Sequence, residues 1–349
     1  MLLSLDCIEA VRRFTDAGLD GTGTAWTATM EEVSRRAKRE IEGRALEIAE
    51  SGLPFDSFDT SDRLLFVLHY ELSNPDHRAM MDDFLDPLRR AVLLDDILNI
   101  KFITYNSPEP YGCLIFQYLP GINIVDNNNN GNPHYKLGDR AISVNFTDLA
   151  HRGYGTFFHE LGHAIDHAMT GGTDTSASGF ASLALYDVLE QDVFAHIEST
   201  VRRFVCDEED IAAIMAAFRY CGNPDNLTEA QRQDFYDVVD DYIRTQGLRY
   251  RNGPQRSASI TFGGFTDIRI RTDANGTEEG RGHGRYHPMT GELMWYDADG
   301  ESTGAHGREF FADMFSTNVR RDTVEAEQNS IYFPNAVIEM EDLIRDHIN

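Results

Sequence analysis

Apolar and polar positions follow helical spacing over most of the first hundred residues. Residues 62–72 are strongly apolar and predict a buried helix. Upstream, Thr29-Met30-Glu31-Glu32 has the form of a capping box and predicts the start of a charged helix. Asn74-Pro75 predicts the start of another helix, reaching about residue 98, because proline is favoured at the first helical position. We therefore expect residues 1–99 to form a helical N-terminal region.

The spacing of apolar residues changes after Asn99. Ile100–Ile103 and Cys113–Phe116 are short apolar runs that predict strands, with a turn at Ser107–Pro110 between them. Ala141–Thr147 alternates apolar and polar residues, which predicts a half-buried strand. Further short strands are predicted at residues 259–262, 267–271 and 292–296.

Helical spacing returns at two places in the second part of the chain. Phe157, Leu161, Ala164 and Ala168 form an apolar stripe and predict one amphipathic helix. The segment from about residue 181 to residue 250 predicts three more helices, which are rich in acidic residues. The mixture predicts an α+β fold, with residues 100–349 as one domain that carries this helical segment as an insert.

The amphipathic helix carries the motif His159-Glu160-Leu161-Gly162-His163. Histidines four residues apart on a helix project from one face and can bind one metal ion. Glu160 lies close enough to hold a water molecule at that metal without being a ligand. Five residues can recur by chance in a chain with twelve histidines, but the helix around them and a strand just upstream favour a site for one zinc ion.

A third ligand has to come from elsewhere in the chain. A histidine six residues beyond the motif is excluded, because Met169 stands there. Glu190 and Glu198 are candidates, and Glu309 is the favoured one. Asp313 follows Glu309 by one helical turn, where a carboxylate can accept a hydrogen bond from a histidine ligand and orient it.

Two other groups of residues have the chemistry of a substrate site. The predicted strand, through Ser143, Asn145 and Thr147, is a candidate edge that binds an extended peptide as an added strand. The glycine-rich loop around His283 and Tyr286 is a candidate for stabilising a developing oxyanion, and a structural hairpin is the alternative.

The composition narrows the class of partner. Lys and Arg total 31 against 58 Asp and Glu, and the net charge of −27 argues against nucleic acid or an anionic membrane as a partner. Four widely spaced cysteines predict no disulfide framework. The first residues lack the basic segment that begins a signal peptide. The sequence contains no apolar run long enough to predict a membrane-spanning helix. We expect a protein made in the cytosol, which a dedicated secretion system can still export.

The pair of segments His159–Asp166 and Glu309-Phe310-Phe311-Ala312-Asp313-Met314-Phe315 resembles the gluzincin-type metallopeptidases that include anthrax lethal factor. In addition, Thr266-Asp267-Ile268 ahead of Gly282–His287 looks like phage head-associated and effector metallopeptidases. The resemblance covers roughly residues 140–170 and 260–316.

This resemblance implies a zincin-like fold and a zinc endopeptidase acting on a protein or peptide. His159, His163 and Glu309 would bind zinc, with Glu160 as general base and Asp313 as the partner of a histidine ligand. Lethal factor has a catalytic tyrosine shortly before its third ligand, whereas residues 302–308 contain none. The role falls to His306 or to His283 or Tyr286.

Three functions remain open at this point. The first is a bacterial effector or toxin protease, and the second is a virion-associated component of phage origin. The third is a zinc-bearing binding module without turnover.

Overall fold

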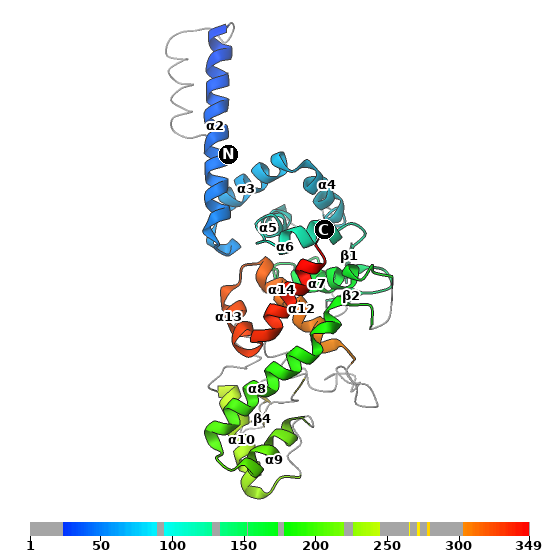
Figure 1. The fold of residues 1–349 in the computed structure, drawn as a ribbon. Helices are drawn as coiled ribbons and strands as arrows, with labels where there is room; N and C mark the ends of the chain where they lie inside the picture. The colour runs from blue at the N-terminus through cyan, green and yellow to red at the C-terminus, as the bar shows by residue number, and fades with distance from the viewer. Residues whose placement is uncertain are drawn as a thin grey trace. The chain divides into compact units, whose positions relative to one another are not determined.

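Helices make up most of the structure, a computed structural model (Figure 1). It describes residues 24–88, 94–127, 133–151, 153–173, 178–219, 226–244 and 303–348, together with Phe265, Arg271–Thr272 and Glu278–Glu279. The chain divides into two compact units, Met1–Ser107 and Pro108–Asn349. The boundary predicted after residue 99 falls inside a helix.

In its described part, the first unit is helical, as predicted. Its elements are α2 (Thr24–Ser51), η1 (Phe55–Ser57), α3 (Thr60–Ser73), α4 (Pro75–Phe84) and α5 (Leu94–Tyr105). α2 begins before the predicted capping box at Thr29, and α4 ends at Phe84 rather than near residue 98. α3 is amphipathic rather than buried, because Leu72 is 79% exposed while Phe66 and Val67 are buried.

Two predicted strands are helical instead. Ile100–Ile103 lies within α5, and Cys113–Phe116 lies within α6 (Tyr111–Tyr118). A short run that is apolar at nearly every position has no periodicity to separate a strand from a buried helix. Ile100 and Phe102 have no exposed surface, and Lys101 between them forms ion pairs of 2.5 Å with Glu71 and 2.6 Å with Asp82.

The second unit combines a small sheet with helices, which confirms the α+β class in its described part. Its strands are β1 (Asn123–Asp126), β2 (His134–Lys136) and β3 (Ala141–Val144), with a separate pair of β4 (Arg271–Thr272) and β5 (Glu278–Glu279). After α6 its helices are α7 (Gly155–Met169), η2 (Ala181–Leu185), α8 (Tyr186–Phe204), α9 (Glu208–Arg219), α10 (Glu229–Arg244), α12 (Ala305–Val319), α13 (Thr323–Tyr332) and α14 (Pro334–Asp346). The three helices predicted at about residues 181–250 correspond to α8, α9 and α10.

The predicted strand at Ala141–Thr147 is shorter and lies at the centre of its sheet. β3 ends at Val144 and pairs in parallel with β1 and antiparallel with β2. Both edges of β3 are therefore occupied, and its four residues are all buried. The prediction of β3 as an edge that receives a peptide is therefore wrong. The sequence did not indicate its two neighbours, because they come from segments that show no clear strand pattern.

The residues assigned to that edge have other environments. Ser143 is 1% exposed, inside the sheet. Asn145 and Thr147 lie in the turn after β3, where the Asn145 Oδ1 accepts hydrogen bonds from the backbone N–H and the hydroxyl of Thr147. Among the described strands of this sheet, β2 is an edge next to α7, and it contacts that helix.

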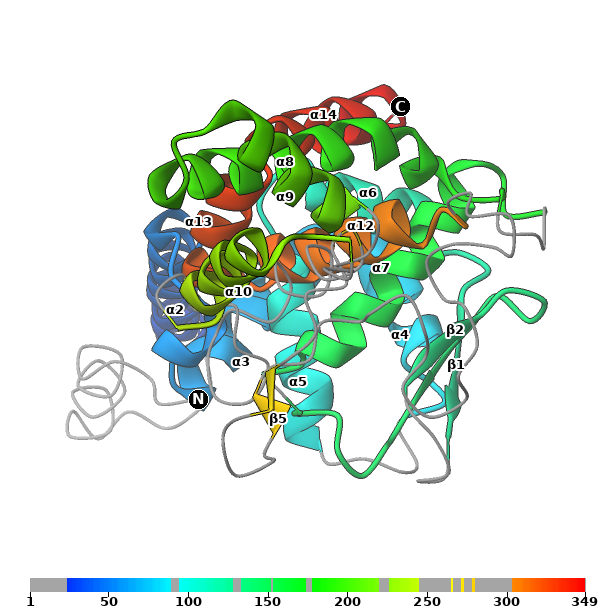
Figure 2. The same ribbon diagram turned by 90° about the horizontal axis from the view of Figure 1, so that it is seen from below.

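α7 and α12 run antiparallel along each other in the core of the second unit (Figure 2). The contacts establish this direction, because Gly155 at the start of α7 accepts a hydrogen bond from Ser316 near the end of α12. Halfway along, a Cβ at Gly162 would lie 2.9 Å from the Cα of Ala312. Glycine at this position lets the two backbones approach closely.

Three of the predicted strands, at residues 259–262, 267–271 and 292–296, lie outside the described residues except for Arg271. Among the helices that the structure describes, none has the length and apolar character of a membrane span.

Replacing Gly162 with alanine is expected to destabilise the second unit. The new methyl group meets the α12 backbone, and overpacking of this kind costs about 1–3 kcal/mol despite the better helix propensity of alanine. Chemical denaturation followed by circular dichroism measures the change. Gly43→Ala in α2 is the control, because a Cβ there meets nothing within 4 Å and should leave stability unchanged or raise it. Equal stability of Gly162→Ala and the parent would contradict the close packing.

Candidate metal centre

The two histidines of the motif lie one turn apart on α7 and face α12. Their ring centroids are 4.7 Å apart with the ring planes nearly perpendicular. Both side chains are mostly buried, at 19% exposed for His159 and 12% for His163. α7 thus presents two imidazoles to one small volume, as the spacing predicted.

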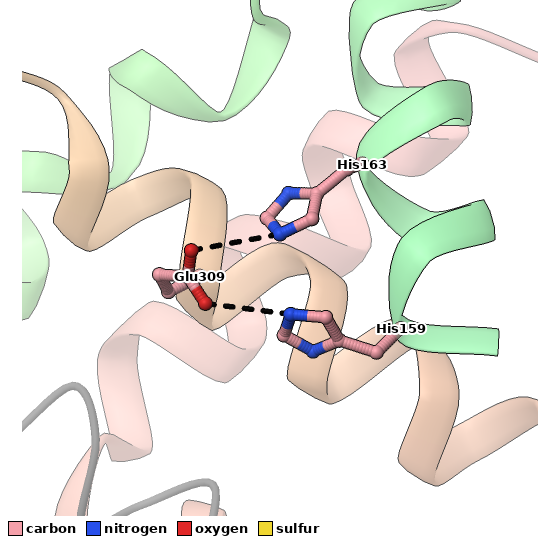
Figure 3. A group of neighbouring side chains, drawn as sticks. All are labelled: His159, His163 and Glu309. Carbon is pink, nitrogen blue, oxygen red and sulfur yellow. Dashed lines mark ion pairs between the residues drawn. The ribbon is translucent and has the colours of Figure 1, made fainter. Parts of the chain in front are cut away.

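Glu309 on α12 completes the group (Figure 3). One of its carboxylate oxygens lies 3.4 Å from the Nε2 of His159, and the other lies 3.6 Å from the Nε2 of His163. The three ligand atoms are all within 4.8 Å of one another. The two other carboxylates considered as third ligand, Glu190 and Glu198, lie on α8 and are not in this group.

Asp313 holds one histidine in place. Its Oδ1 lies 2.7 Å from the Nδ1 of His159, and the acid is one helical turn beyond Glu309 on the same side of α12. A carboxylate at Nδ1 fixes the ring orientation and leaves Nε2 directed at the metal position. The antiparallel pairing of the helices explains these contacts: the earlier histidine, His159, lies opposite the later acid, Asp313, and His163 lies opposite Glu309.

The distances suit a zinc ion. Zn–N and Zn–O bonds of about 2.0–2.2 Å in a tetrahedral arrangement place neighbouring ligand atoms roughly 3.3–3.6 Å apart. Each histidine Nε2 lies at such a distance from one Glu309 oxygen, with Oε2 at 3.4 Å from His159 and Oε1 at 3.6 Å from His163. Two imidazoles and one carboxylate are also the donor set of zinc sites that keep a position open for water.

The two histidines differ in their electrostatic surroundings. Burial lowers the pKa of His163 to about 3, against the attraction of Glu309, so this ring is neutral as a ligand must be. Burial also opposes the charged form of His159, but Asp313 and Glu309 outweigh it and raise its pKa well above the usual value. Without metal, the site therefore holds a proton on His159 between two carboxylates.

Glu160 is 5% exposed and lies beside the ligand group. Burial raises its pKa to about 7, with the charge of Glu309 adding to the effect. The charge of His159 and a hydrogen bond from the backbone N–H of Tyr135 on β2 oppose the shift. A carboxyl group that titrates near neutral pH can both accept and release a proton there.

Tyr135 ties the edge strand to the helix at a second point. Its hydroxyl lies 2.9 Å from the Nδ1 of His167, a fully buried residue seven positions beyond Glu160 on α7. The backbone and side chain of one β2 residue thus contact α7 at two points that are about two helical turns apart. No pattern in the sequence indicates this residue, because a three-residue strand is too short to show alternation.

The candidate oxyanion residues have separate outcomes. His306, on the first turn of α12, is fully buried, and its ring centroid lies 4.0 Å from Phe265 and 5.3 Å from Tyr186. It does not belong to the ligand group found among the described residues. His283 and Tyr286 lie outside the described residues. The oxyanion role stays a prediction for all three.

Asp166 is another buried acid of α7 that the sequence analysis did not assign. It has no exposed surface, and its oxygens accept hydrogen bonds from the backbone N–H of Ser182, at 2.8 Å, and from the Ser182 hydroxyl. Burial raises the pKa of Asp166 to about 7. On the other side, a Cβ at Gly307 would lie 2.2 Å from the Ser182 carbonyl oxygen, so η2 is held between α7 and the start of α12.

The chain matches no protein-family model, and searches of curated proteins and of solved structures found no similar protein. The function is therefore inferred from the site itself.

Asp313→Asn is expected to weaken zinc binding by about 10- to 100-fold, because the His159 ring loses the carboxylate that orients it. Competition with a chromophoric chelator measures the affinity. Asp342→Asn, which changes an exposed acid paired with Arg345, is the matched control and should bind zinc like the parent. Unchanged affinity of Asp313→Asn would show that the hydrogen bond is dispensable.

Zinc binding is expected to release a proton near neutral pH. Because the His159 pKa is raised, the metal-free ring is protonated there, and a ligand must be neutral. Affinity should therefore fall as pH decreases. Calorimetric titrations in buffers of different ionisation enthalpy count the protons released. Asp313→Asn removes a cause of the raised pKa and should release fewer; equal release by both proteins would contradict the assigned cause.

Proposed function

We propose that this protein is a zinc-dependent endopeptidase that hydrolyses peptide bonds in a protein substrate. The observation that carries the proposal is the fit of Glu309 to both motif histidines, one oxygen to each Nε2, at 3.4 and 3.6 Å. A zincin-like catalytic fold is part of the proposal. Its support is the small sheet packed on α7, together with the helix α12 that supplies the third ligand.

His159, His163 and Glu309 would hold the metal, with Asp313 orienting His159. When bound, zinc supplies Lewis acidity, which polarises a carbonyl group and lowers the pKa of water to about 7. The ligand side chains are 12–27% exposed, so the site is partly shielded from bulk solvent.

Glu160 is proposed as the general base and acid. It would take a proton from the attacking water and pass it to the leaving amine, which requires a group that is easily protonated and deprotonated at working pH. Its burial and its place beside the ligand group support this role. The Tyr135 N–H fixes the carboxylate at the edge of the sheet, next to the metal ligands.

A polypeptide is the substrate class that the surroundings favour. β2 is an edge strand among the described elements of the sheet, and Tyr135 brings it against the helix that carries the site. An extended peptide can pair with such an edge through backbone hydrogen bonds, which recognise the chain regardless of its side chains. The role first assigned to β3 is thus proposed for β2.

Glu160→Gln tests the proposed chemistry. The variant should bind one zinc ion, because Glu160 is not a ligand, and should lose at least about 100-fold in peptide hydrolysis, because glutamine cannot carry the proton. Mass spectrometry of a broad peptide library measures cleavage. Glu208→Gln, at an exposed glutamate on α9, is the matched control and should retain full activity.

Two outcomes would sink the proposal. One is a zinc-loaded parent that cleaves nothing in the library, which would favour a zinc-bearing binding module. The other is a Glu160→Gln variant as active as the parent. In parallel, Glu309→Ala should lose zinc while Glu190→Ala keeps it, and the reverse result would move the third ligand to α8.

A further inference from the structure

Arg308 stands immediately before the proposed ligand Glu309 on α12 and is partly buried. The centre of its guanidinium group lies 5.0 Å from the centroid of the Phe180 ring. A cation held over an aromatic face has a defined position. In a protein with a net charge of −27, a fixed positive charge next to a metal-ligand group is a notable feature.

The guanidinium group lies toward the end of the site that is formed by the later turns of α7. The Phe180 ring beneath the guanidinium group has its centroid 5.3 Å from that of the His167 ring. His167 is one helical turn beyond His163 on α7. One turn of α-helix advances about 5.4 Å. Arg308 is also the direct neighbour of Glu309 on α12, so it lies beside the ligand group.

The charges of Glu309 and Asp166 act on Arg308 from a distance, but neither acid forms a short ion pair with it. Asp166 uses its oxygens for the backbone N–H and hydroxyl of Ser182, and Glu309 faces the two histidines. In the described part of the chain, no ion pair of 4.0 Å or less joins Arg308 to either acid. A planar guanidinium has five N–H donors suited to binding a carboxylate through two parallel hydrogen bonds.

We propose that Arg308, supported by Phe180, forms a subsite that binds an aspartate or glutamate side chain next to the scissile bond. The inference rests on the proposed peptidase function and names the class of sequence that it cleaves. A position one turn along α7 from the metal ligands suits a neighbouring side chain of the substrate better than the oxygen of the reacting carbonyl. Arg308 is thus a specificity residue.

Matched peptide libraries, one with glutamate and one with glutamine fixed at each position in turn, test the subsite. The parent should prefer glutamate at one position beside the cleaved bond. Arg308→Gln should lower kcat/KM for those peptides by about 10- to 100-fold, as expected for a lost hydrogen-bonded ion pair, and leave the glutamine peptides unchanged. Arg308→Lys should keep part of the preference.

Arg202→Gln is the matched control, because Arg202 is an exposed arginine paired with Glu198 and Glu208 on the helical insert. It should behave like the parent. Three results overturn the subsite while leaving a peptidase in place: no preference for glutamate, a preference that survives in Arg308→Gln, or an equal loss on all peptides. Loss of zinc by Arg308→Gln would also overturn it, since the residue would then serve to hold Glu309.

Direct binding separates this inference from the proposed function. Fluorescence anisotropy with zinc-loaded Glu160→Gln compares labelled glutamate and glutamine peptide pools without any cleavage. The negative net charge of the protein disfavours binding of the glutamate pool. Tighter binding of that pool by Glu160→Gln, lost in the double variant with Arg308→Gln, therefore supports the subsite. This result holds even if the parent cleaves nothing. Equal binding of the two pools overturns it.

Discussion

The close approach of α7 and α12 is the constraint on which the site depends. Gly162 places no side chain between the two helices, and Ala312 opposite is nearly as small. Glu309 and Asp313 can therefore reach the histidines of α7 with short side chains. A wider spacing would move all these contacts together, because antiparallel helices that pack along their length transmit a displacement at one point to the others.

The same contact concentrates carboxylates in a small volume. Glu160 and Asp166 lie on α7, and Glu309 and Asp313 lie on α12. Burying such charges costs free energy unless they are paired or bound to a metal. A divalent cation would neutralise part of this charge, so metal binding and folding of the second unit are expected to be coupled.

Each of these acids has a distinct partner, and the partner determines what the acid can do. Asp313 faces a histidine Nδ1, while Glu309 faces two Nε2 atoms. Asp166 is engaged with Ser182 and stabilises the packing of η2. Glu160 accepts a hydrogen bond from a backbone N–H of the edge strand, and it is the acid proposed for proton transfer.

Local pattern was a good guide where it was periodic and a poor one where it was not. The apolar stripe of α7 predicted the helix and the direction of its histidines. Ile100–Ile103 and Cys113–Phe116 were predicted wrongly, because a short run that is apolar at nearly every position carries no periodic signal in either conformation. β3 was recognised as a strand, but its neighbours β1 and β2 were not, so its central place in the sheet could not be read from its own residues.

The sequence by itself determined the pair of histidines on one helical face, the acid between them and the Glu309 and Asp313 pair, because each depends on spacing within one helix. Only the tertiary structure decided which carboxylate meets the histidines, which strand forms the edge, and that Arg308 and Tyr135 border the site. Those relations join residues far apart in the chain, and they follow from how α7, α12 and β2 pack together rather than from any local repeat.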